Sequence, residues 1–237
     1  MPQPLTYALK LATGVGIVAA IAVHFLASPL LLWTLAPLAT LLILAIAFAN
    51  WRTRKDRYSL WITIGLLFSL VGDILLLTPD HFFLLGLSTF LLTHIAYLLA
   101  FTCDTHFPAR PGVWILYLLF ALCCNFLLFS RLPASLRLPV AVYSLFLVSM
   151  AAQAMGRSLL LRTPAARLAA IGALLFVLSD SLLALNRFYA PLRLASLLIL
   201  VPYYAAQWLI AFSTDVLPLP SRLFFRRNSA TTNRISS

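Results

Sequence analysis

Residues 59–77 read SLWITIGLLFSLVGDILLL, a run of 19 residues in which Asp73 is the only charged side chain. As an α-helix this run is about 28 Å long, close to the hydrocarbon thickness of a bilayer. Because lipid offers no hydrogen-bond partners, a spanning segment must satisfy its own backbone, and an unbroken apolar run does so as a helix. The stretch therefore predicts a transmembrane helix.

The rest of the chain has the same character. Of its 237 residues 62% are hydrophobic and only 10% are charged, whereas a soluble domain carries about 25% charged residues. A chain of this composition cannot cover a water-facing surface. We therefore predict an all-α, polytopic membrane helix bundle.

Eight apolar runs are long enough to cross the bilayer, and prolines or charges mark most of their junctions. They are Tyr7–Leu26, Pro29–Asn50, Ser59–Leu77, Phe82–Cys103, Gly112–Phe129, Pro139–Gly156, Ala166–Asn186 and Leu194–Ser213. The first run could also be a signal peptide, but it is long for one and the next follows at once, so we interpret it as a retained helix. The predicted organisation is an eight-helix domain over residues 1–214 and a basic, disordered tail over residues 215–237.

Positive charge is unevenly distributed between the two ends of the spans. With the N-terminus in the cytoplasm, 13 of the 17 Lys and Arg residues fall inside, and Arg131, Arg137, Arg187 and Arg193 fall outside. The positive-inside rule therefore predicts a multi-pass protein, which we place in the plasma membrane with both termini cytoplasmic. The net charge of +11 lies where lipid headgroups are, so we expect no nucleic-acid binding.

Two segments resemble each other at an offset of 107 residues. Residues 65–73 read GLLFSLVGD and residues 172–180 read GALLFVLSD, and Tyr97 and Tyr204 keep the same offset in the spans that follow. A true repeat would make two parallel four-helix halves related by an axis along the membrane normal. Coincidence in leucine-rich sequence is the alternative.

Asp73 and Asp180 are the only acidic residues inside the predicted spans, and the chain has no glutamate. A carboxylate in the membrane costs about 2.5 to 3.5 kcal/mol on insertion scales, so both are candidate functional residues. The alternative is a protonated aspartate that hydrogen-bonds a neighbouring helix. Both lie a few residues below the outer end of their spans. If these spans are neighbours, the carboxyls can meet, and one of them stays protonated as a general acid.

Other polar side chains in the later spans indicate a polar interior cavity. The candidate substrate-binding residues are His94, Tyr97, Tyr143, Tyr203, Tyr204, Gln207 and Arg187, and Asn125 and Gln153 add polar atoms. His94 and Tyr97 share a helix face, although we expect His94 to lie nearer mid-membrane than the aspartates. Interhelical hydrogen bonds are the alternative for these side chains, and a headgroup anchor is the alternative for Arg187.

No metal or cofactor is expected. The histidines and the three cysteines show no zinc-binding spacing, and a glycine-rich phosphate loop is absent. The sequence does not indicate an oligomeric state.

The chain resembles the YhhN-like family of membrane lysoplasmalogenases from about Pro37 to Phe212. The matching pieces are Gly72-Asp73 followed by ILLL, Phe83–Phe101 with Gly86, Phe90, His94 and Tyr97, then Tyr143, residues 172–180 with Phe188, and Tyr203-Tyr204-Ala-Ala-Gln207. One departure is Ala36-Pro37, where the family often has a Lys-Pro pair.

The resemblance implies hydrolysis of the vinyl ether bond of a lysoplasmalogen, a lysophospholipid, to a fatty aldehyde and a glycerophospho-alcohol. This acid-catalysed reaction needs one proton donor and one carboxylate, much as glycoside hydrolysis does. Asp73 and Asp180 are the candidates, and the sequence leaves open which takes which role.

Two further classes of function remain open from the sequence. Intramembrane Asp, His and Tyr side chains also form proton relays, so a small transporter or proton-coupled carrier is the main alternative to a lipid hydrolase. A non-catalytic lipid-binding protein or scaffold is the third.

Overall fold

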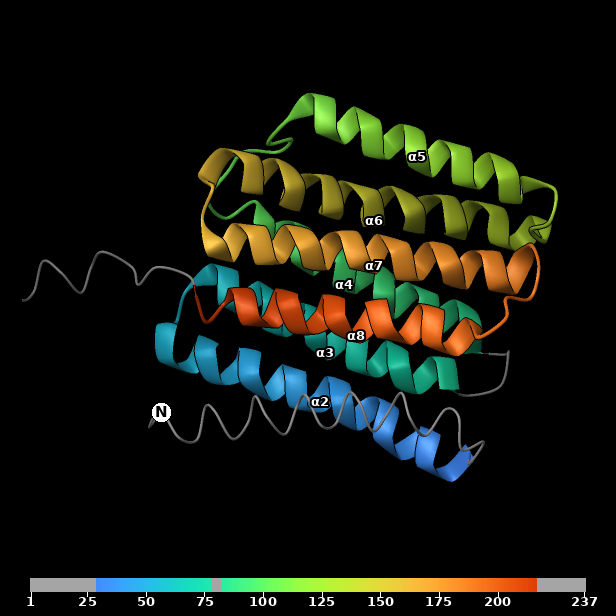
Figure 1. The fold of residues 1–237 in the computed structure, drawn as a ribbon, viewed down its shortest axis with the longest axis horizontal. Coiled ribbons are helices and arrows are strands. Elements are labelled where there is room, and N and C mark those ends of the chain that lie inside the picture. The colour runs from blue at the N-terminus through green and yellow to red at the C-terminus, as the bar shows by residue number, and fades with distance from the viewer. Residues whose placement is uncertain (1–28, 78–81, 217–237) are drawn as a thin grey trace, which may run out of the picture.

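The computed structural model describes residues 29–77 and 82–216 of the chain, and every regular element in them is an α-helix. The seven described helices are α2 (Pro29–Arg54), α3 (Arg57–Leu77), α4 (Phe83–Phe101), α5 (Pro111–Phe129), α6 (Ala134–Leu161), α7 (Pro164–Phe188) and α8 (Ala195–Ser213). They lie side by side as one elongated bundle (Figure 1).

Local signals explain where several helices begin and end. Asp56 precedes α3 and accepts a hydrogen bond from Ser59 N (2.8 Å), which satisfies a backbone donor that the first turn leaves free. At the junction between α6 and α7, Arg162 takes a left-handed conformation (φ 55°) and ends α6. Thr163 then caps α7 by accepting from Ala166 N (3.3 Å), and Pro164 occupies its first turn.

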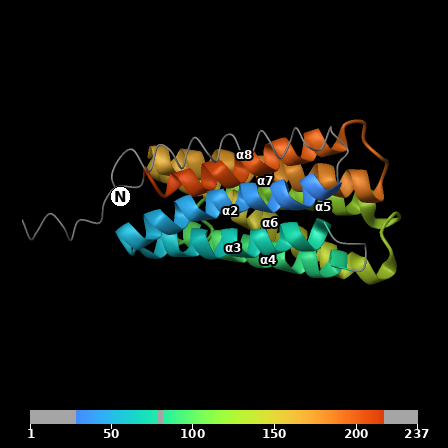
Figure 2. The same ribbon diagram turned by 90° about the horizontal axis from the view of Figure 1, so that it is seen from below.

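The helices pair in a regular pattern. The most extensive contacts join α3 to α4 and α7 to α8. α2 packs against α3 and α8, and α6 packs against α7 and α4. α5 lies at one edge of the bundle against α6 (Figure 1) and barely touches α7. In the view of Figure 2, α3 and α4 lie along one side of the bundle and α7 and α8 along the other.

Small residues let α7 and α8 approach closely. Ala169, Ala170 and Ala173 on α7 and Ala206 on α8 are all buried. A Cβ placed on Gly172 would lie 2.9 Å from the carbonyl oxygen of Ala206, so the backbones are too close there for any side chain. Such contacts are typical of membrane helices, whose association depends on close packing.

The outer surface of the bundle is suited to lipid. Six of the described helices, α3 to α8, are long and apolar enough to cross a membrane. On α5 large apolar side chains point outward, including Phe126 at 86% exposure. The chain is therefore a multi-pass membrane protein.

Several predicted boundaries are confirmed within two to four residues, but the sixth span is not. Pro139, which we expected to mark a junction, lies inside α6, which runs from Ala134 to Leu161. A proline in the second turn removes one backbone hydrogen bond, and the helix continues past it. The first predicted span (residues 7–26) and almost all of the predicted tail lie outside the described residues, so the count of eight helices stays a prediction.

Candidate active site

Asp180 on α7 contacts polar side chains of two other helices. The Tyr143 hydroxyl on α6 donates to Asp180 Oδ2 across 2.5 Å. His94 Nε2 on α4 lies 3.4 Å from the same oxygen and 3.0 Å from the Tyr143 hydroxyl. Because Tyr143 gives its hydrogen to Asp180, its oxygen accepts from His94, and Nε2 carries a hydrogen in this arrangement.

His94 is completely buried and held by aromatic rings. Its imidazole packs edge-on against Phe176 (centroids 4.9 Å apart) and against Tyr143 (5.0 Å). The expected position of His94 nearer mid-membrane than the aspartates weakened a direct contact with them, yet its Nε2 lies 3.4 Å from Asp180 Oδ2. Side chains lean toward the N-terminus of their helix, and the N-terminal end of α4 is at the same end of the bundle as Asp180.

Asp73 on α3 has its own partners. Thr40 on α2 donates to Asp73 Oδ2 across 2.5 Å, and Tyr203 on α8 donates to Oδ1 across 2.7 Å. Among the described residues these partners are neutral hydroxyl groups, and no basic side chain forms an ion pair with Asp73.

A second layer of polar side chains positions Tyr203. Gln207 Nε2, one turn further along α8, donates to the Tyr203 hydroxyl (3.2 Å) and to Ser69 Oγ (2.7 Å). Gln207 Oε1 accepts from the Tyr97 hydroxyl across 2.5 Å. Since Tyr203 accepts from Gln207, its own hydrogen is directed to Asp73.

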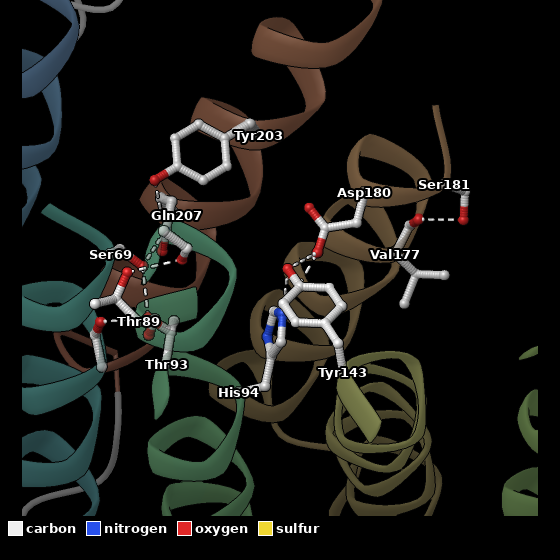
Figure 3. A network of polar contacts seen from close by, with 12 residues as sticks. Ser69, Thr89, Thr93, His94, Tyr143, Val177, Asp180, Ser181, Tyr203 and Gln207 are labelled. Atoms are coloured by element: carbon white, nitrogen blue, oxygen red, sulfur yellow. Dashed lines mark hydrogen bonds and ion pairs between the residues drawn. The ribbon is translucent and has the colours of Figure 1, made fainter. Parts of the chain in front are cut away.

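The two carboxyl groups belong to separate hydrogen-bond clusters. Figure 3 shows Tyr203, Gln207 and Ser69 in one group and His94, Tyr143 and Asp180 in the other. α3 and α7 make no direct contact in the described part of the chain, so the adjacency on which a direct meeting of the carboxyls depended is not found. Phe176 lies between the clusters, with its ring 4.9 Å from that of His94 and 5.6 Å from that of Tyr203.

Both carboxyl groups nevertheless line one cavity of about 370 Å³. Asp73 is four residues from the end of α3, and Asp180 is eight residues from the end of α7. Polar lining is contributed by Tyr143, Tyr203, Tyr204, Asn125, Ser144, Ser179, Ser181, Asn186, Arg187 and Ser196. The remaining lining is apolar, and each helix from α3 to α8 contributes to it. The volume is in the range of small-ligand sites.

Arg187 lines the same cavity, one residue before the end of α7. Its guanidinium stacks over the ring of Phe83 at 4.0 Å from the centroid. Seven residues, about 10 Å of helix, separate Arg187 from Asp180. The cavity is thus lined by a cation as well as by two carboxyl groups.

The predicted site residues divide into two groups. Asp73, Asp180, Tyr143, Tyr203, Tyr204 and Arg187 line the cavity. His94, Tyr97 and Gln207 do not, but lie fully buried behind it. His94 and Gln207 hydrogen-bond to the lining residues Tyr143 and Tyr203, and Tyr97 hydrogen-bonds to Gln207. Sequence reasoning missed Thr40 and Ser69. Ser69 is one turn before Asp73 on the same face, a spacing that would have identified it, whereas Thr40 has no such signal.

Two predicted polar or basic residues, Gln153 and Arg157, lie instead near the connection between α4 and α5. Gln153 binds the connection between α4 and α5, accepting from Ala109 N (2.9 Å) and donating to Thr105 (3.0 Å). Arg157 lies inside α6, is 1% exposed, and forms a bidentate ion pair with Asp104 (both contacts 2.7 Å). The predicted sixth span ends at Gly156, which implied that Arg157 lies in a loop. In the structure it is a helical residue of α6.

In the described residues, no three His, Cys, Asp or Glu side chains lie close enough together to hold a metal ion. The cavity itself presents carboxyl and phenol groups, and the His94 imidazole lies behind them.

Comparison with known proteins identifies relatives of the chain. The YhhN family model matches residues 31–214, which include both carboxyl groups and every helix around them. No solved structure matches the chain.

Three curated relatives bear the name lysoplasmalogenase TMEM86B. The pig protein (Sus scrofa) is 38% identical over 161 residues, which are 68% of this chain and 66% of the relative. The human protein (Homo sapiens) is 34% identical over 79% of this chain and 78% of its own length. The rat protein (Rattus norvegicus) is 35% identical over 72% of this chain and 69% of its own length.

Proposed function

The chain belongs to the YhhN family, and from that membership we propose that it is a membrane-embedded lysoplasmalogenase that hydrolyses the vinyl ether bond of lysophospholipids. The observation that carries the proposal is the convergence of Asp73 and Asp180 on one cavity in the outer half of the bundle. The names of the curated relatives support the same reaction.

The reaction requires a proton and a water molecule. A proton is added to the β-carbon of the vinyl ether, and the positive charge that results is shared between the α-carbon and the ether oxygen. Water adds to the α-carbon and loses a proton, and the hemiacetal so formed collapses to a fatty aldehyde and a glycerophospho-alcohol. Proton transfer from a positioned side chain contributes about 10²- to 10⁴-fold to such a step.

The surroundings of the two carboxyl groups support different roles. Asp180 lies beside His94, the basic side chain nearest to either carboxyl among the described residues, and it accepts from Tyr143. We assign it the carboxylate that stabilises the cation and activates water. Asp73 is bonded to neutral hydroxyls, no basic side chain among the described residues forms an ion pair with it, and we assign it the proton donor.

The lining of the cavity supports one orientation of the substrate. Arg187 at the outer end is placed for the phosphate. The glycerol backbone then lies between Arg187 and the two carboxyl groups, and the vinyl ether reaches the level of Asp180. In this orientation the tyrosines bind the reacting part of the lipid, and His94, Tyr97 and Gln207 position the groups that touch it.

The finer features of the architecture are also proposals. Two parallel halves are supported by the contacts, since α2 packs on α3 and α8 while α6 packs on α7 and α4. Each aspartate correspondingly takes one partner from the preceding helix and one from the other half. The charge distribution supports a plasma-membrane protein with cytoplasmic termini, and with it a first helix before α2 and a cytoplasmic tail.

The test of the function is the substrate preference of the purified protein in detergent micelles. A lysophospholipid with a vinyl ether should release fatty aldehyde. The saturated ether of equal chain length should not react, because it has no double bond to protonate, and the ester should not react by this route. Equal turnover of the ester, or no aldehyde from the vinyl ether, would refute the proposed activity.

The carrier considered above is not favoured by the comparisons, because the named relatives are enzymes. Vesicles containing the protein discriminate between the two. The enzyme should convert the lysolipid without accumulating it, whereas a carrier would take it up unchanged.

A further inference from the structure

α5 forms a wall of the cavity without taking part in either carboxyl cluster. Its cavity face consists of Phe120, Ala121, Cys124, Asn125 and Leu128, a spacing that places them on one side of the helix. Ala121 and Leu128 are the only buried residues of α5, so the helix uses its one buried face to line the cavity. None of these side chains bonds to Asp73 or Asp180.

Two side-chain hydrogen bonds set the register of α5 against α6. Trp114 Nε1 donates to Ser149 Oγ across 3.1 Å. Asn125 Nδ2 donates to Ser144 Oγ across 2.7 Å. Ser144 follows Tyr143, which binds Asp180, so Asn125 lies at the level of the carboxyl group. Because the two helices are joined by a short connection and run in opposite directions, Ala121 and Val148 lie one turn, about 6 Å, deeper toward mid-membrane.

The cavity is apolar at that level. Ala121, Leu147, Val148 and Val177 are at most 5% exposed and carry no polar side-chain atoms. An apolar extension that begins at a reaction centre and leads toward mid-membrane matches the hydrocarbon chain attached to the vinyl ether.

We propose that the α5–α6 side of the cavity, at Cys124, Ala121 and Val148, is the subsite for the first part of the alkenyl chain. The inference rests on the proposed function, because that function supplies the chain. α5 then selects among alkenyl chains of different size. Because α5 makes few contacts with α7, it can adjust its position as a chain packs between it and α6.

Two adjacent cysteines provide native probes of this subsite. Cys124 lines the cavity, whereas Cys123 is exposed on the lipid-facing side of the same helix. The third cysteine, Cys103, lies exposed beyond the end of α4 and is replaced by serine in both test proteins. Cys103→Ser with Cys123→Ser leaves Cys124 alone, and Cys103→Ser with Cys124→Ser is the matched control.

The experiment measures the rate at which methyl methanethiosulfonate modifies each protein in micelles, read by intact mass. The probe ligand is a saturated-ether lysophospholipid with a 16-carbon chain, which occupies the site without reacting. Modification of Cys124 should slow at least fivefold with the ligand, and modification of Cys123 should not change. No protection of Cys124, equal protection of both cysteines, or a Cys124 that never reacts would each overturn the subsite.

A second pair of variants tests selectivity. Ala121→Phe narrows the subsite, while Leu122→Phe places the same side chain at a neighbouring position that is 57% exposed. The ratio of kcat/KM for a 16-carbon over a 4-carbon alkenyl chain should fall at least tenfold in Ala121→Phe relative to Leu122→Phe. Equal ratios would contradict the subsite. Absence of turnover in the unmodified protein would instead refute the proposed function, and the ligand protection of Cys124 would still decide the subsite.

Discussion

The hydroxyl of Tyr143 donates to Asp180 across 2.5 Å while accepting from His94, so three helices hold one carboxyl group in place. The Asp73 carboxyl is held in the same way, through Tyr203 and Thr40. Each carboxyl therefore faces the cavity with its orientation set by a phenol. The predictions below test these contacts and the packing that supports them.

Removal of the Tyr143 hydroxyl should reduce turnover without unfolding the protein. A hydrogen bond to a charged group contributes about 1.5 to 3 kcal/mol, so Tyr143→Phe should lower kcat about 10- to 100-fold and leave KM nearly unchanged. Tyr117→Phe on α5 is the control, since Tyr117 neither lines the cavity nor bonds to a carboxyl. A Tyr143→Phe enzyme with the kcat of Tyr117→Phe would show that the contact has no role in catalysis.

His94 should affect the rate through Asp180 and not through binding of the lipid. His94→Gln keeps a side-chain N–H donor in the buried position, whereas His94→Leu removes it. We expect His94→Gln to retain part of kcat and His94→Leu to lose it, with KM similar in both, because His94 does not line the cavity. A change confined to KM in these variants would mean that the imidazole contacts substrate.

The close approach of α7 and α8 should be sensitive to a single methyl group. Gly172→Ala places a Cβ 2.9 Å from a backbone oxygen of α8, and overpacking of this kind costs about 1 to 3 kcal/mol. Gly112→Ala is the matched control, because nothing lies within 4 Å of a Cβ built there. Thermal unfolding in micelles should show a lower Tm for Gly172→Ala only, and equal Tm values would contradict the packing.

The sequence was sufficient to predict the helices because apolar runs of span length have few alternatives in lipid. The same argument identified Asp73 and Asp180, since a carboxyl group in such a run is unusual. It could not place His94, because the position of a residue along its own helix does not say which neighbouring helix it faces. Thr40 was missed for a related reason, as a threonine in an apolar run looks the same whether or not it meets a carboxyl group.

The ion pair between Asp104 and Arg157 should contribute to stability and not to catalysis. Asp104→Ala leaves Arg157 buried without its carboxylate, a change that costs about 3 kcal/mol or less here because the Asp104 side chain is 38% exposed. The double variant Asp104→Ala with Arg157→Met removes the unpaired charge and should recover part of the lost Tm. Turnover by the folded fraction should stay normal throughout, and a selective loss of kcat at full Tm would contradict this assignment.

The most direct test of the central claim is aldehyde release from a vinyl-ether lysophospholipid by Asp73→Asn and Asp180→Asn, compared with the unmodified protein and with Asp56→Asn. Asp56 caps α3 outside the cavity, and asparagine can still accept the hydrogen bond from Ser59 N. We predict that each cavity variant loses about 100-fold or more of kcat while Tm and elution from size-exclusion columns are retained, and that Asp56→Asn stays active. Release at the unmodified rate by either folded cavity variant would contradict the account.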